Sequence, residues 1–265
     1  MSCCSHFWNV LATFHAELED TNFDLASVRR LLPEIESPVL VVGAGQGLIV
    51  EELRKRGCEC DGVDLSSEMI RQAKLRRGIS LVQADAKAMP FPAASYQTII
   101  YATGVVDFTA DNGDIRAMLM EGRRVVKASG KIFVAFYKAS TAQEKFLEMV
   151  GLTRDHKLAF RESLEIYLMN PVQLVGWVAR RAGLSRFRAT MALLRVAGRS
   201  TMQERRNTLK MQRVFRMLGD PRSLIDAAPE ELPYRNEKEI ENLFKRLGIP
   251  IKQLRALASC RVVQI

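Results

Sequence analysis

The stretch Val39-Leu-Val-Val-Gly-Ala-Gly-Gln-Gly47 decides how the rest of the chain is interpreted. Its first four residues are apolar and three of them are β-branched, which is typical of a strand buried on both faces of a parallel sheet. Glycines at 43, 45 and 47 then let the backbone turn sharply and come close to a ligand, because they carry no Cβ. From Leu48 the apolar spacing becomes helical. A strand, a glycine turn and a helix N-terminus together indicate a nucleotide-binding element.

The composition is that of a folded globular protein. The chain has 265 residues, of which 48% are hydrophobic, and no run approaches the roughly 18 apolar residues that a membrane span needs. The first 20 residues have no Lys or Arg before their apolar part, which speaks against a secretory signal. The five cysteines lack zinc-site spacing, so no metal is predicted. We therefore predict a cytoplasmic protein with reduced cysteines.

The formal net charge of +9 is unevenly distributed. Residues 171–219 contain eleven Lys and Arg residues and a single acid, Glu204, whereas the remainder of the chain is close to neutral. The sequence therefore predicts a near-neutral body that carries one basic module.

Two carboxylates follow the next two predicted strands. Asp64 ends the strand after the glycine turn, at the distance where an acid binds the ribose hydroxyls in nucleotide sites. Asp85 ends the third strand, where a carboxylate can accept from an exocyclic amino group of adenine. Further strands are expected at 97–102 and 131–137, with a helix between them and a turn at Ser129-Gly130. This alternation of strands and helices predicts a doubly wound, mostly parallel α/β sheet.

The chain resembles the class I S-adenosylmethionine-dependent methyltransferases, in particular the branch that methylates quinone precursors, lipids and other small molecules. The resemblance covers 39–137 and rests on the glycine loop and on three further segments. The C-terminal segment is similar to the antiparallel hairpin that closes the seven-stranded, Rossmann-like sheet of this family. The three segments are Gly62-Val-Asp64-Leu-Ser66 with Met69, Gln83-Ala-Asp85-Ala86 with Met89-Pro90-Phe91, and Arg124-Val-Val-Lys-Ala-Ser-Gly130.

The resemblance implies S-adenosylmethionine as cofactor and assigns a role to each part of the site. The glycine loop would surround the methionine moiety, Asp64 would hold the ribose, and two apolar residues would pack on the adenine. Asp85 and its neighbour would bind the adenine edge, and the tip of the fourth strand would border the methyl group and the acceptor. The implied cofactor residues are Gly43, Ala44, Gly45, Gly47, Asp64, Leu65, Met69, Asp85, Ala86 and Ala102, with Tyr101 and Thr103 beside the last.

One position departs from the family pattern. The family usually has an acid two residues before the first glycine, which helps to organise the loop and the amino group of the cofactor, whereas this chain has Val41. Another acid, such as Asp107, could take that role. A nicotinamide-dependent oxidoreductase is the competing interpretation of the loop, but its fingerprint requires the third glycine three residues after the second, and here Gly47 comes two after.

Four segments are expected. Residues 1–36 would form an N-terminal helical lid, 37–137 the cofactor-binding core, 138–236 a basic helical insertion that caps the substrate, and 237–265 the last helix and hairpin. Three interpretations of the insertion stay open: a helical cap with solvated arginines, a surface that contacts an anionic membrane, and an RNA-binding module, which the scarcity of aromatic residues disfavours.

The predicted activity is methyl transfer from S-adenosylmethionine to a small, hydrophobic or lipid-like acceptor. An RNA methyltransferase and a non-catalytic cofactor-binding scaffold are the alternatives. The general base is not identified by the sequence, nor are the acceptor atom and the oligomeric state. Candidate bases are Tyr101, Asp107, Tyr137 and His15.

Overall fold

A computed structural model describes residues 8–9, 11–12, 23–106, 109, 111–137, 169–199, 202, 209, 212–213, 216, 236–257 and 260–265. The chain divides into two compact units. The first comprises Met1–Thr13, Asn22–Lys138 and Tyr234–Ile265, and the second comprises Phe14–Thr21 and Ala139–Pro233. The second unit contains most of the segment predicted as an insertion.

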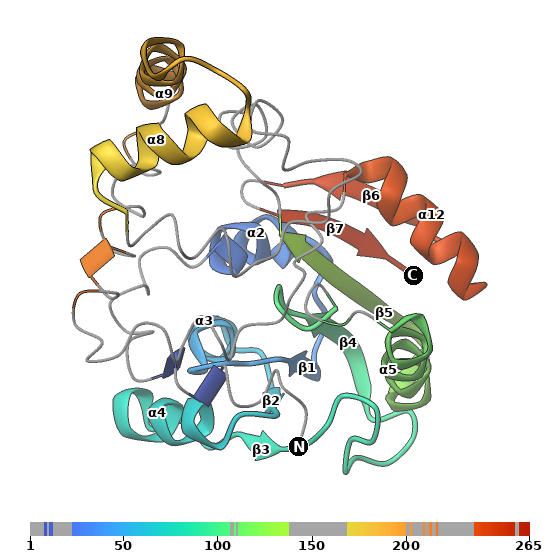
Figure 1. Ribbon diagram of the computed structural model, residues 1–265. Coiled ribbons are helices and arrows are strands. Elements are labelled where there is room, and N and C mark those ends of the chain that lie inside the picture. The colour runs from blue at the N-terminus through green and yellow to red at the C-terminus, as the bar shows by residue number, and fades with distance from the viewer. Residues whose placement is uncertain are drawn as a thin grey trace. The chain divides into compact units, whose positions relative to one another are not determined.

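The first unit is built on one seven-stranded sheet (Figure 1). The strand order is β3-β2-β1-β4-β5-β7-β6; strands β1 to β5 run parallel, and β7 pairs antiparallel with both β5 and β6. This confirms the predicted doubly wound sheet with its C-terminal hairpin. The strands are β1 Val39–Val42, β2 Cys60–Asp64, β3 Val82–Gln83, β4 Tyr96–Tyr101, β5 Val126–Tyr137, β6 Gln253–Ala256 and β7 Cys260–Gln264.

Helices cover both faces of this sheet (Figure 1). Alternate residues of β1 point to opposite faces: Leu40 and Val42 join the core under α5 and α12, whereas Val39 and Val41 join the core under α2 and α3. A short 3-10 helix, Leu32–Glu34, follows α2. The α-helices of this unit are α2 Phe23–Leu31, α3 Leu48–Lys55, α4 Ser67–Arg77, α5 Asn112–Val125 and α12 Glu237–Leu247.

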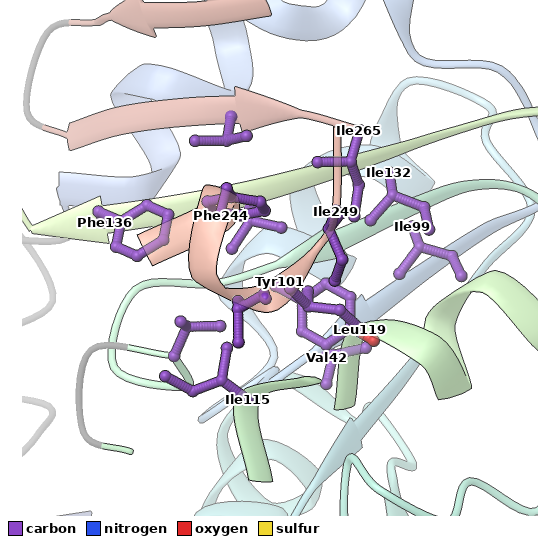
Figure 2. Packing of buried hydrophobic residues seen from close by; sticks show 14 of the residues in the cluster. Val42, Ile99, Tyr101, Ile115, Leu119, Ile132, Phe136, Phe244, Ile249 and Ile265 are labelled. Carbon is purple, nitrogen blue, oxygen red and sulfur yellow. The ribbon is translucent and has the colours of Figure 1, made fainter. Parts of the chain in front are cut away.

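The core beneath α5 and α12 is shown in Figure 2. It contains Phe136 and Phe244, whose rings meet edge to face with centroids 6.2 Å apart, and the fully buried Tyr101. The C-terminal residue Ile265 reaches the same cluster and donates its backbone N–H to the carbonyl of Ile132. Ile265 is therefore part of the hydrophobic core.

Strand β5 begins earlier than expected. The strand is assigned from Val126 to Tyr137, but its pairing with β4 shifts register between Val126 and Lys131, the stretch that contains the turn predicted at Ser129-Gly130. A Cβ on Gly130 would lie 2.5 Å from a Val126 methyl group and 2.7 Å from the carbonyl oxygen of Gln97. Residues 126 and 130 are close together, so the chain bends within this stretch, and the glycine allows both the bend and the close approach to β4.

The described part of the second unit is a helical hairpin. Helix α8, Pro171–Arg181, begins with a capping box in which Asn170 and Gln173 satisfy each other's backbone N–H. Helix α9, Arg186–Arg199, packs against α8 through a small apolar cluster of Val178, Ala179 and Ala189. None of the described helices is long and apolar enough to cross a membrane.

Candidate cofactor site

The glycine loop leaves β1 in the conformation that the sequence predicts. Gly43, Gly45 and Gly47 all have positive φ, at 72°, 54° and 79°, a region that favours glycine. The N–H groups of Gly43 and Ala44 both donate to the carbonyl of Val63, at 3.0 and 2.9 Å. These bonds attach the loop to the end of β2, so its remaining atoms face the carboxyl edge of the sheet.

Asp64 connects the glycine loop to the start of α4. Its Oδ2 accepts from the N–H of Gly45 at 2.7 Å, and its Oδ1 accepts from the N–H of Ser66 at 2.8 Å. Ser66 in turn caps α4 by accepting from Met69 at 3.1 Å. A carboxylate has about four acceptor sites. The bonds from Gly45 and Ser66 therefore leave acceptor capacity on the carboxylate, which a ribose hydroxyl could use.

Burial raises the pKa of Asp64, and the backbone N–H groups of Ser66, Gly45 and Leu65 oppose that rise because they stabilise the ionised form. The carboxylate is thus held in place by dipoles rather than by a cationic side chain. A carboxylate in this setting favours a neutral hydroxyl donor as its ligand over an anionic group, which would need a cation beside it.

The residues expected around the adenine differ in accessibility. Leu65 is 39% exposed at the carboxyl edge, whereas Met69 is buried. Asp85 is partly exposed; its Oδ1 accepts from the N–H of Lys87 at 2.9 Å, and its Oδ2 lies 3.8 Å from the Lys87 ammonium. Ala86 packs at the edge of the core. Leu65 and Asp85 therefore keep exposed surface that an adenine ring could contact. Met69 is buried, so it can only support the residues that make this contact.

The Lys87 ammonium donates to Asp114 at 3.1 Å, and this bond is the main reason that its pKa is raised. Asp114 belongs to the first turn of α5. The lysine therefore connects the loop after β3 to the start of α5 and holds the Asp85 region in place.

Two residues that the sequence interpretation missed connect the N-terminal segment to this site. Asn9 Oδ1 accepts from the Ser66 hydroxyl at 2.6 Å and from the N–H of Glu68 at 3.3 Å. Gln46, inside the glycine loop, donates from Nε2 to the carbonyl of Ala12 at 2.9 Å. A polar residue within the apolar N-terminal run was the only sequence signal for Asn9. These contacts attach Asn9 to the start of α4 and Ala12 to the glycine loop.

Tyr101 is not a candidate base, contrary to expectation. Its side chain is fully buried, and its hydroxyl donates to the carbonyl of Met118 in α5 at 2.5 Å. Burial raises the pKa of its phenol, so the phenolate is disfavoured. Figure 2 shows the ring among apolar side chains of the core. Tyr101 is therefore a structural residue.

The neighbouring residue Ala102 faces the other way. It is buried, and a Cβ on Gly43 would lie 3.9 Å from its methyl group, so it borders the glycine loop as expected. Tyr137 is half-buried at the end of β5, opposite Cys260 of β7. Asp107 and His15 lie outside the described residues. Of the four candidate bases, only Tyr137 is both described and partly accessible.

Val41 is fully buried in the core beneath α2 and α3, between Gly62 of β2 and Ile100 of β4. A small cavity of about 10 Å³ lies in this same core, lined by residues of α2, β4, β5 and β7. It could hold at most about one water molecule. This cavity is therefore too small for an acceptor.

Among the described residues, no three histidine, cysteine or carboxylate side chains are grouped as metal ligands. Burial raises the pKa of the Cys60 thiol to about 12. That cysteine is therefore a structural residue of β2.

Parts of this chain are similar in sequence to known methyltransferases. Residues 39–130 match a protein family described as "Methyltransferase domain". A demethylmenaquinone methyltransferase from Corynebacterium kroppenstedtii is 32% identical over 115 residues, which are 43% of this chain and 48% of that protein. A malonyl-[acyl-carrier protein] O-methyltransferase from Enterobacter lignolyticus is 34% identical over 86 residues, 32% of this chain and 34% of that protein. The matches thus span about half or less of the length of these relatives.

A solved structure from Rhodobacter sphaeroides, described under Zn-dependent alcohol dehydrogenases, superposes with a TM-score of 0.57 at 12% identity, over 100% of this chain and 97% of that one. At this identity the likeness shows the fold alone.

The strand order, the glycine loop and the acid at the end of β2 define a class I S-adenosylmethionine-dependent methyltransferase fold. Residues 39–130 match a family of methyltransferase domains, which confirms the predicted resemblance for that segment.

Proposed function

We propose that this chain is an enzyme that transfers the methyl group of S-adenosylmethionine to a small, hydrophobic or lipid-like acceptor. The observation that carries the proposal is the Asp64 carboxylate, which is fixed by two backbone N–H groups beside the glycine loop and retains acceptor capacity. The names of two relatives, a menaquinone precursor methyltransferase and an acyl-carrier-protein methyltransferase, support an acceptor of lipid-like character.

The residues present fit this cofactor. A Cβ at Gly45 would meet no atom within 4 Å, so there is open space beside this residue of the loop. Gln46 Oε1 is buried, and the described residues provide no donor for it. We assign this oxygen to the cofactor's amino group, in place of the acid that Val41 replaces. Gly43, Ala44 and Gly47 would shape the space around the methionine moiety, Asp64 would hold the ribose, and Leu65 with Asp85 and Ala86 would bind the adenine.

When bound, S-adenosylmethionine supplies an electrophilic methyl group on a sulfonium. The task of the protein is then to align the acceptor in line with that methyl group and to exclude water. Ala102, directly after β4, borders the loop, and Tyr137 at the end of β5 is the described residue that, once ionised, could receive a proton from the acceptor. If the acceptor is a phenolate that reacts through one of its ring carbons, it would need little help from a base.

The four segments keep their proposed roles: 1–36 as a lid, 37–137 as the cofactor-binding core, 138–236 as a cap over the acceptor, and 237–265 as the closure of the sheet. The contacts of Asn9 and Gln46 support the first of these assignments. Peripheral contact with an anionic membrane would bring a lipid-like acceptor within reach of such a cap.

A non-catalytic cofactor-binding scaffold is the second candidate, because Val41 stands where the family usually has an acid. Calorimetric titration of the full chain with S-adenosylmethionine is the first test, and micromolar binding is expected. A chain that binds no cofactor would exclude both candidates. Binding without transfer of labelled methyl to quinone precursors, acyl carriers or RNA would favour the scaffold, and transfer to RNA alone would identify an RNA methyltransferase.

A further inference from the structure

Helix α9 exposes large apolar side chains along one face. Phe187, Met191 and Leu194 are 75%, 40% and 59% exposed. They are spaced by four and three residues, so they form one continuous stripe along the helix. Isolated exposed apolar residues are common on protein surfaces, but a stripe of three on one helix indicates an interaction site.

This stripe is not the face that stabilises the hairpin. Ala189 is fully buried against Val178 and Ala179 of α8, and Leu193 packs on the same cluster. Residues on an α-helix are about 100° apart, which puts Ala189 roughly opposite the Phe187–Leu194 stripe. Helix α9 therefore uses one apolar face for its own packing and presents a second apolar face to solvent.

Arginines flank the exposed stripe on both sides. Arg188 and Arg195 lie roughly 90° to one side of it and Arg186 roughly 100° to the other, and all three are exposed. There is no Asp or Glu anywhere between 171 and 199. The long arginine side chains can extend along an apolar layer while their guanidinium groups stay at its polar boundary.

We propose that α9 is an interfacial helix that binds the surface of an anionic phospholipid bilayer. The apolar stripe would enter the boundary between headgroups and acyl chains, and the flanking arginines would contact lipid phosphates. A helix of 14 residues spans only about 21 Å, less than the roughly 30 Å hydrocarbon layer, so it would lie along the surface and not cross it.

A membrane surface fits this face better than a nucleic acid does. Single-stranded nucleic acids are bound by arginines together with aromatic side chains that stack on bases. The exposed stripe contains one aromatic residue, Phe187, and two flexible aliphatic residues that have no flat surface for stacking. The inference does not depend on methyl transfer, although it would explain how a lipid-like acceptor is reached.

Flotation of the full chain with lipid vesicles tests the proposal. We expect the chain to float with vesicles that contain phosphatidylglycerol and to stay at the bottom of the gradient with pure phosphatidylcholine. High salt should weaken the binding, because it screens the arginines. Absence of flotation with the anionic vesicles, or equal flotation with both compositions, would overturn the proposal, as would binding to single-stranded RNA without binding to vesicles.

Two double variants locate the binding on α9. Phe187→Ser with Leu194→Ser, and separately Arg188→Gln with Arg195→Gln, should each lower the partition coefficient by about tenfold or more. Matched controls in the first unit are Leu75→Ser with Met120→Ser, which are exposed apolar residues, and Arg123→Gln with Arg246→Gln, which are exposed arginines. If the controls lose as much binding as the α9 variants, the helix is not the site.

Cofactor affinity in the same preparations separates this proposal from the proposed function. Circular dichroism first confirms that each variant is folded. S-adenosylmethionine should then bind the α9 variants as it binds the original chain. A chain that floats but does not bind the cofactor would refute the proposed function alone, and a chain that binds the cofactor but does not float would refute the membrane proposal alone.

Discussion

The two strands that flank β1 both end in a polar residue, and the two residues have different fates. Asp64 ends β2 at the carboxyl edge, where it accepts from two backbone N–H groups and keeps acceptor capacity. Tyr101 ends β4, and its only hydroxyl is used by the carbonyl of Met118. A polar residue at the end of a strand can therefore belong to a binding site or to the core.

The register of the sheet explains the difference. Tyr101 is paired with Val42, and paired residues of neighbouring strands point to the same face, so the tyrosine joins the core beneath α5. Asp64 lies one residue beyond Val63, the partner of Val42, and its carboxylate meets the glycine loop. The consequence is that Asp64 should affect cofactor binding and Tyr101 should affect stability.

The largest expected effect is that of Asp64→Ala on cofactor affinity. The substitution removes two charge-assisted hydrogen bonds to the ribose, each worth roughly 1.5–3 kcal/mol, so the affinity should fall by at least about a hundredfold. Calorimetric titration measures this change, and circular dichroism should show that the fold is retained. Asp61→Ala is the matched control, because Asp61 is on the same strand and bonds to Tyr96 instead. Unchanged affinity in Asp64→Ala would mean that the ribose binds elsewhere.

Tyr101→Phe should show the opposite pattern. Loss of the hydroxyl leaves the Met118 carbonyl without this donor in the core, and we expect the free energy of unfolding to fall by about 1–2 kcal/mol. Denaturant titration measures the loss. Cofactor affinity and methyl transfer should stay within about twofold of the original values, less than the effect of a general base. A hundredfold fall in kcat at unchanged stability would return Tyr101 to the list of candidate bases.

Asn9→Ala tests whether the N-terminal segment, like Asp64, contributes to cofactor binding. The variant removes the acceptor for the Ser66 hydroxyl and for the Glu68 N–H, at the start of the helix that follows Asp64. We expect cofactor affinity to fall by about fivefold, equivalent to one hydrogen bond of ordinary strength. Asn242→Ala, on the exposed side of α12, should leave the affinity unchanged. Equal affinities in both variants would show that the segment does not help to bind the cofactor.

Local sequence patterns were enough to predict the fold and the position of Asp64. The glycine spacing and the acid after β2 are properties of short segments, and the structure has both as expected. The role of Tyr101 depends on the pairing of β4 with β1, which no single segment specifies. The same holds for Asn9 and Ser66, which are 57 residues apart in the chain. Contacts of this kind depend on tertiary packing, and the sequence gives no local sign of them.

Glu52→Gln should have the smallest effect and should depend on pH. Glu52 of α3 pairs with Arg29 of α2 and with Arg56, and hydrogen bonds from these two arginines lower its pKa to about 2. A depressed carboxyl pKa stabilises the fold above the unfolded value, and this contribution is lost as the pH falls from about 4.5 towards 2. Because exposed ion pairs contribute little, we expect about 0.5–1 kcal/mol near pH 7. Thermal unfolding of both chains across this pH range should show a difference that shrinks with acidification, whereas cofactor affinity at pH 7 should not change. A constant difference in stability at all pH values would mean that the ion pairs do not cause it. A change in cofactor affinity would mean that the contact between α2 and α3 contributes to cofactor binding.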